Sequence, residues 1–259
     1  MPDAPGPGVS PVPTGAGAPA AGGGACRGGG VRMAVLAFLI VLGVRVAGAA
    51  HTHCIARDGP EYVKVARAYA RGDWGTALAH PYHPLYPALI GFVHEAESFF
   101  RTHFRARPND LPEDWERSAR WVSLAASSLT VIPLWILAAG AGGRRAGLLA
   151  ALLFAALPNG VEFGTAVLTT SLFTFLTLVS LAFGLTALRT GRSRHWVWGG
   201  LVAGLSYWVR LDGFVTAGAL AAAAFLPARR RGRNRRPAQP GACAPRRRCW
   251  PVWPSWCRT

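Results

Sequence analysis

The sequence RDGPEYVKVARAYARGDWGTALAHPYHPLYP, residues 57–87, separates two strongly apolar stretches of the chain. It contains acids, histidines and basic residues, whereas the residues on either side are mostly aliphatic or aromatic. A polar segment of this kind is typical of a loop at a membrane surface. We therefore expect residues 51–83 to form an extracytoplasmic loop in which chemistry can take place.

The first part of this loop has the pattern of a short amphipathic helix. Asp58, Pro60 and Glu61 are typical of a helix start, with Asp58 as N-cap and Glu61 as its capping-box partner. Apolar residues then recur at helical spacing from Tyr62 to Tyr69. The basic residues on another face are Lys64, Arg67 and Arg71. Such a face is most often solvated or set among lipid headgroups.

The second part of the loop is broken by prolines. Residues 74–79 predict another short helix, and Pro81, Pro84 and Pro87 then prevent regular helix until the chain becomes apolar again. His80 and His83 lie in this proline-rich stretch. Two acids, two histidines and a basic stripe are therefore expected together at a membrane surface.

The composition indicates a multi-pass membrane protein. Of 259 residues 51% are hydrophobic and 15% are charged, and the apolar residues come in long blocks. The net charge of +16 depends on ten arginines in residues 229–259, which leaves +6 on residues 1–228. No nucleic-acid recognition motif accompanies these arginines, so no nucleic-acid partner is expected.

The cysteines and histidines do not predict a metal site. The five cysteines show no metal-binding spacing, and His51, His53 and Cys54 are too close in sequence to supply a full coordination shell alone. No metal ligand and no cofactor is therefore assigned, and a divalent cation stays an open alternative.

The chain divides into three parts. Residues 1–30 are rich in Gly, Ala and Pro and are expected to be a disordered tail. Residues 31–227 are expected to form the transmembrane domain. The apolar segments are 31–50, 83–104, 118–139, 146–158, 167–188, 196–209 and 214–226. The predicted fold is an all-α polytopic bundle of about six or seven transmembrane helices, several of them short enough to require tilted or broken helices.

Two features of the first segment need interpretation. A cleaved signal peptide is the alternative for residues 31–50, and an uncleaved helix is preferred because further apolar spans follow. Arg45 lies inside this segment. We expect its side chain to extend outward to the membrane interface rather than into a polar cavity.

Basic loops predict the orientation of the later spans. If Arg144, Arg145, Arg189, Arg192, Arg194 and the arginines of residues 229–236 all face the cytoplasm, then residues 159–170 and 210–213 face outside together with the Asp58 loop. A complete crossing by residues 83–104 would break this alternation. Either that segment does not cross fully, or one basic loop violates the rule.

Residues 228–259 differ abruptly from the rest of the chain, because they are rich in Arg, Pro, Trp and Cys without helical periodicity. One interpretation is a basic, disordered cytoplasmic tail that binds anionic lipid. The preferred interpretation is translation out of the natural frame, which would make the chain a truncated product of a longer gene.

Several short motifs follow one another in a characteristic order. They are Glu61-Tyr62, Gly72-Asp73-Trp74, His83-Pro84-Leu85-Tyr86, Ala119-Arg120 with Ser123, Gly143-Arg144-Arg145-Ala146, and Gly204-Leu205 with Tyr207 and Arg210. Together with Asp58 they resemble the N-terminal half of GT-C membrane glycosyltransferases, which include protein O-mannosyltransferases and lipid A aminoarabinose transferases. The resemblance covers residues 33–226.

The resemblance implies a function and a set of site residues. It implies transfer of a sugar, with inversion, from a polyprenyl-phosphate donor to a lipid or protein acceptor, in the plasma or inner membrane. Asp58 would be the general base, and His83 and Arg210 would contact the donor phosphate. Glu61 and Tyr62 join the substrate-binding residues.

Structural alternatives apply to two of these residues: Asp58 as a plain helix cap and Arg210 as an ion-pair partner of Asp212. The chain also departs from its relatives in one respect, because Thr170 stands where they commonly carry an acid, and Glu162 is the nearest substitute. The competing functions are a transporter that binds a lipid phosphate without chemistry and a non-catalytic membrane protein.

Overall fold

The computed structural model describes residues 27–51, 56–104 and 111–233, and the described part is helical without β-strands. The helices are α1 (Arg27–His51), α2 (Gly59–Ala70), α3 (Trp74–Ala79), α4 (Leu85–Phe104), α5 (Pro112–Leu129), α6 (Val131–Gly142), α7 (Arg144–Ala156), α8 (Pro158–Thr165), α9 (Thr169–Thr190), α10 (Ser193–Tyr207) and α11 (Gly213–Arg233). The predicted all-α class is confirmed.

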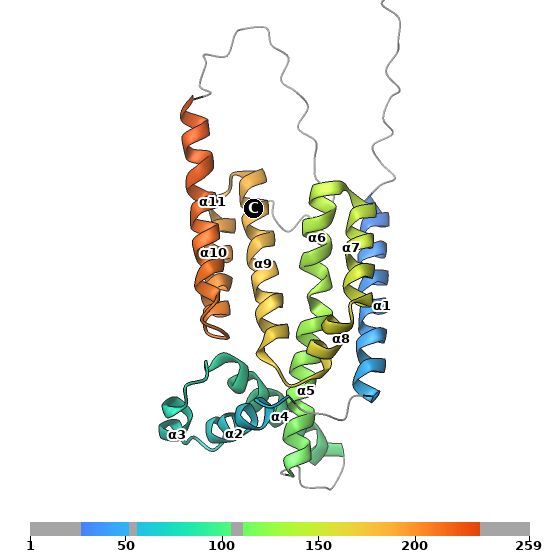
Figure 1. The fold of residues 1–259 in the computed structure, drawn as a ribbon, viewed down its shortest axis with the longest axis vertical. Coiled ribbons are helices and arrows are strands. Elements are labelled where there is room, and N and C mark those ends of the chain that lie inside the picture. The colour runs from blue at the N-terminus through green and yellow to red at the C-terminus, as the bar shows by residue number, and fades with distance from the viewer. Residues whose placement is uncertain (1–26, 52–55, 105–110, 234–259) are drawn as a thin grey trace, which may run out of the picture.

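The helices form two layers. The long helices α1, α5 with α6, α7, α9, α10 and α11 stand side by side, and α2, α3 and α4 lie across one end of this bundle (Figure 1). Within the described residues, the helices long and apolar enough to cross a membrane are Arg32–His51, Pro112–Gly142 and Thr169–Thr190. The pair α7 and α8 passes the same test as one span bent by 67°.

The α5–α6 span is longer than a bilayer requires. Its 31 residues measure about 46 Å at 1.5 Å per residue, against about 30 Å of hydrocarbon. Its first turns therefore extend beyond the bundle, where the buried side chains of Trp115 and Ala119 share a core with Tyr62 and Ala66 of α2. This core joins the outer layer to the bundle.

α4 belongs to the outer layer, which favours the alternative that residues 83–104 do not cross fully. Its polar residues are used in contacts with α5: Arg101 pairs with Asp114 at 3.3 Å, and Glu97 pairs with Arg117 at 3.5 Å. On the apolar side of α4, the buried hydroxyl groups of Tyr86 and Ser123 are 2.8 Å apart. α4 is not among the helices long and apolar enough to cross a membrane, which agrees with the alternative that residues 83–104 do not cross fully.

The basic turns lie together at one end of the bundle. The α6–α7 turn at Arg144 and the α9–α10 turn at Arg192 are at the end opposite to α2–α4 (Figure 1). Arg189 connects the two turns by donating a hydrogen bond to the carbonyl oxygen of Gly140 at 2.6 Å. The predicted common side of these loops is confirmed.

Arg45 is buried, and the prediction that it extends to the membrane interface is wrong. Its side chain is fully enclosed, and its Nη2 donates to the carbonyl oxygen of Phe154 at 3.2 Å. That carbonyl would normally accept from residue 158, but Pro158 has no N–H. Arg45 therefore satisfies the acceptor that the α7–α8 break leaves free. A Cβ at Gly160 would come within 2.9 Å of the Arg45 guanidinium, so a larger residue there would displace the end of the arginine side chain.

The ends of the chain show further differences from the expected boundaries. α1 begins at Arg27, inside the expected tail, and α11 continues past Pro227 to Arg233. Residues 1–26 and 234–259, with most of both expected tails, lie outside the described residues, as do Cys54 and His53.

Candidate functional site

The expected loops meet at the end of the bundle that carries α2–α4. The N-terminal turns of α2 and α9 and the α10–α11 turn contact one another there, through Tyr62 with Thr169 and Arg210 with Thr170. The expectation that residues 159–170 and 210–213 join the Asp58 loop is confirmed by these contacts. All five predicted site residues lie on these segments or on the loop before α4: Asp58, Glu61 and Tyr62 at the start of α2, Arg210 on the α10–α11 turn and His83 on the loop.

Asp58 occupies the N-cap position of α2 but does not cap it. Its backbone is already helical, with φ −84° and ψ −11°, and its carboxylate makes no capping hydrogen bond. A capping side chain normally needs extended backbone at this position. The alternative of a plain N-cap is therefore wrong, and the exposed carboxylate of Asp58 is left for other interactions.

Tyr62 is buried at the centre of the site. Burial raises the pKa of its phenol, the charges of Asp58 and Tyr82 raise it further, and a hydrogen bond with Thr169 and the charge of Arg210 act in the opposite direction. The phenol is therefore protonated at neutral pH. The charges of Asp58 and Arg210 therefore both act on this one buried phenol.

Arg210 is half-exposed and shares its guanidinium among several groups. Nη1 donates to Thr170 Oγ1 at 3.4 Å, Nη2 pairs with Asp212 at 3.2 Å, and the group lies 5.7 Å from the ring centroid of Phe173. The expected Asp212 pair is thus present, but it leaves 43% of the Arg210 side chain exposed. The charge is accessible to an anion.

The α10–α11 turn that carries Arg210 is held tightly. A Cβ at Gly213 would overlap the backbone of Tyr207, so only glycine fits where the two helices turn. The backbone N–H of Leu85 donates to the carbonyl oxygen of Trp208 at 3.2 Å, which fixes this turn to the start of α4. His83, on the loop before α4, lies edge-on to Tyr207 at the end of α10, with the ring centroids 5.7 Å apart, and is therefore close to the turn that carries Arg210.

Glu61 has a different role from the one expected. Its carboxylate lies 3.2 Å from His80 Nε2 and 3.9 Å from Lys64 Nζ. The capping-box prediction is wrong, because the helical backbone at residue 58 removes the geometry that a capping box requires. His80 in turn stacks on Tyr82 at 4.7 Å, and Tyr82 packs on Tyr62 at 4.7 Å. Glu61 thus connects to the site through aromatic rings.

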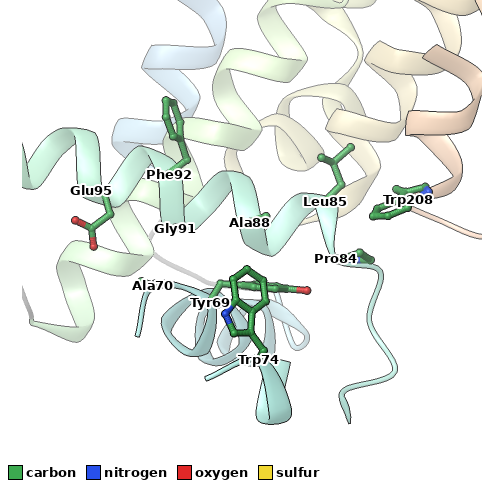
Figure 2. Close-up of a pocket in the computed structure, with 10 residues that line it drawn as sticks. All are labelled: Tyr69, Ala70, Trp74, Pro84, Leu85, Ala88, Gly91, Phe92, Glu95 and Trp208. Carbon is green, nitrogen blue, oxygen red and sulfur yellow. The ribbon is translucent and has the colours of Figure 1, made fainter. Parts of the chain in front are cut away.

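An apolar cavity of about 460 Å³ adjoins the site. It lies between α4 and the α2–α3 pair, with Tyr69 and Trp74 below α4 and Trp208 beside Pro84 at one end (Figure 2). Phe92 is 71% exposed on α4, and its side chain extends away from Trp74 (Figure 2). The cavity suits a hydrocarbon chain.

No cluster of three or more potential metal ligands occurs within residues 27–51, 56–104 and 111–233. The proposed substitute acid, Glu162, is exposed on α8, and it is Thr170 that lies against Arg210. Sequence reasoning missed Thr169, Tyr82 and the pairing role of His80. The histidine-and-tyrosine repeat of residues 80–86 was the available signal for the last two.

Comparison with known protein families identifies a match. A model described as dolichyl-phosphate-mannose-protein mannosyltransferase matches residues 109–242, just over half of the chain. The chain therefore belongs to this family of GT-C membrane glycosyltransferases. Arg210 and Thr170 lie in the matched region, whereas Asp58 and His83 precede it. No curated protein and no solved structure matches the chain.

Proposed function

We propose that the chain transfers a sugar from a polyprenyl-phosphate donor to a lipid or protein acceptor at the extracytoplasmic face of the plasma or inner membrane. The observation that supports this most strongly is that the carboxylate of Asp58, which makes no capping hydrogen bond, and the 43% exposed Arg210 both act electrostatically on the buried Tyr62. An acid without a capping role and an accessible cation are the two groups that such a transfer requires.

Each site residue has a separate role in the transfer reaction. The acceptor hydroxyl oxygen attacks the anomeric carbon as the bond between that carbon and the phosphate oxygen breaks, and Asp58 takes the hydroxyl proton. Arg210 and His83 stabilise the phosphate as it departs with the electron pair. Tyr62, protonated at neutral pH, can donate a hydrogen bond to a substrate oxygen. Glu61 orients the loop through His80.

The fold supports the membrane orientation and the lipid nature of the donor. The arginine-rich turns at one end favour the cytoplasm, which supports an extracytoplasmic position for α2–α4 and the site. The apolar cavity beside Trp208 and Tyr69 can hold the isoprenoid part of the donor next to Arg210. A lipid donor explains why the site lies where the bundle meets the outer layer.

The proposal is tested by donor choice. Membranes that contain the chain receive either a radiolabelled polyprenyl-phosphate sugar or the corresponding nucleotide sugar, and label transferred to lipid or protein is measured. Transfer from the lipid-linked donor alone is expected. Transfer of label from the nucleotide sugar would overturn the proposal. Binding of the lipid donor without transfer of label to any acceptor would also overturn it, and would favour a lipid-phosphate transporter or another non-catalytic role.

A further inference from the structure

A second hollow lies beside α2, where this helix meets α3 and α5. Its volume is about 420 Å³, and it is lined by side chains of α2, by Asp73 and Thr76 at the start of α3, and by Pro112 and Glu116 of α5. It is separate from the apolar cavity beside Trp208, with which it has no lining residue in common.

Three cations line this hollow. Lys64, Arg67 and Arg71 are three and four residues apart on α2, so they share one face of the helix. The Lys64 side chain is 65% exposed and its contact with Glu61 is long at 3.9 Å, so its charge is little neutralised. The predicted basic stripe is therefore not a flat solvated face, because it forms one wall of a concave surface.

Arg67 is held in a fixed orientation within this wall. Its guanidinium carbon lies 5.6 Å from the ring centroid of Trp115 on α5. Its Nε is buried, and among the described residues it has no hydrogen-bond partner. A buried N–H donor without a partner is costly, which is a reason to expect an acceptor that the protein itself does not supply.

The acids of the hollow do not cancel these charges. Asp73 accepts a hydrogen bond from the backbone N–H of Thr76 at 3.1 Å and is used as the cap of α3. Glu116 is the other acid in the lining. The hollow is therefore positive, because its lining has three cations and two acids, and one of these acids is hydrogen-bonded to the backbone.

We propose that this hollow binds a phosphate group, held by Lys64, Arg67 and Arg71. Arginine matches the geometry of phosphate oxygens through paired N–H donors, and lysine adds a mobile positive charge. The phosphate can belong to an anionic lipid headgroup or to a soluble phosphorylated molecule. The site is independent of the transfer reaction, although Lys64 connects it to Glu61 and hence to His80.

Binding is measured on the full chain by equilibrium dialysis with radiolabelled inorganic pyrophosphate. Arg67→Gln and Arg71→Gln are each expected to weaken binding by about tenfold, because each removes a charge-assisted contact. Arg71 is exposed, so its variant tests the site even if Arg67→Gln perturbs the packing on Trp115. Arg145→Gln, at an exposed arginine of the opposite end, is the matched control and should bind as the wild type does.

The source of the phosphate is distinguished in lipid nanodiscs. If phosphatidic acid added to phosphatidylcholine discs blocks pyrophosphate binding, the ligand is a lipid headgroup; if it does not, the ligand is soluble. Three results would overturn the proposal. These are absence of pyrophosphate binding to the wild type, equal weakening by Arg145→Gln, and binding that survives Arg67→Gln and Arg71→Gln but is lost in Arg210→Gln.

Discussion

The α7–α8 break and the α10–α11 turn each bring an arginine to an interruption between apolar helices, but they use it differently. At the first, Arg45 is fully buried and donates to the free carbonyl of Phe154. At the second, Arg210 remains 43% exposed, with Thr170 and Asp212 as partners. One guanidinium completes the backbone of the fold, and the other is accessible to a ligand.

The aspartates at the starts of α2 and α3 make the same contrast. Asp73 accepts the backbone N–H of Thr76 and caps α3, whereas the carboxylate of Asp58 caps nothing. A polar side chain whose hydrogen bonds are taken up by the backbone serves the fold. Asp58 and Arg210, whose charges are not taken up in this way, are the better candidates for chemistry.

The largest expected effect of this difference is on Arg210. Arg210→Gln should lower single-turnover sugar transfer about 100-fold or more, because it removes a charge that stabilises the departing phosphate. Thermal stability should change little, since the lost Asp212 pair is exposed. Arg210→Lys should recover part of the rate. Transfer at the wild-type rate in Arg210→Gln would place Arg210 among the structural residues.

Arg45 should show the opposite behaviour. Arg45→Ala leaves a cavity and an unsatisfied carbonyl at Phe154, and we expect a loss of about 2 to 4 kcal/mol in unfolding free energy in detergent. Arg45→Met keeps most of the volume and isolates the hydrogen bond, so it should lose less. Arg145→Ala, at an exposed position, is the control and should stay within about 0.5 kcal/mol. Equal stability of Arg45→Ala and the wild type would refute the backbone role.

Gly213→Ala tests whether the close turn positions Arg210. The added Cβ would overlap the Tyr207 backbone, so we expect a loss of about 1 to 3 kcal/mol and slower transfer. Gly218→Ala is the matched control within α11, because a Cβ there meets nothing within 4 Å. Alanine is also the better helix former, so this control should be unchanged or slightly stabilised. Equal stability and equal transfer rates in the two variants would show that the close contact at Gly213 does not position Arg210.

The smallest expected effect concerns the cap at Asp73. Hydrogen bonds from Thr76 lower the pKa of its carboxyl, so its stabilising contribution is complete above the unfolded pKa of about 3.9 and is lost as pH falls through the lower folded value. Hydrogen-exchange protection of the Thr76 amide should therefore fall in acid. Asp73→Asn can still cap but cannot titrate. Hydrogen-exchange protection of the Thr76 amide in Asp73→Asn should therefore not change with pH in this range. If protection in this variant fell in acid as it does in the wild type, titration of Asp73 would not be the cause.

The sequence predicted what depends on local pattern and failed where distant contacts decide. Apolar blocks predicted the helices, and the basic loops predicted the two sides of the bundle and that residues 210–213 would join the Asp58 loop. The apolar run at residues 83–104 gave no sign that Glu97 and Arg101 would pair with α5 and keep α4 out of the bundle. Nor could local pattern show that Pro158, more than a hundred residues away, would determine the position of Arg45.

The central claim is that Asp58 acts in chemistry rather than in the fold, and Asp58→Asn tests it most directly. In one preparation, the affinity for the polyprenyl-phosphate sugar and the single-turnover transfer rate are measured, with Glu113→Gln, an exposed acid of α5, as control. We predict donor affinity close to that of the wild type and a rate lower by about 100-fold or more, as loss of a general base produces. Sugar transfer by Asp58→Asn at the rate of the Glu113→Gln control would contradict a role of Asp58 in the chemistry.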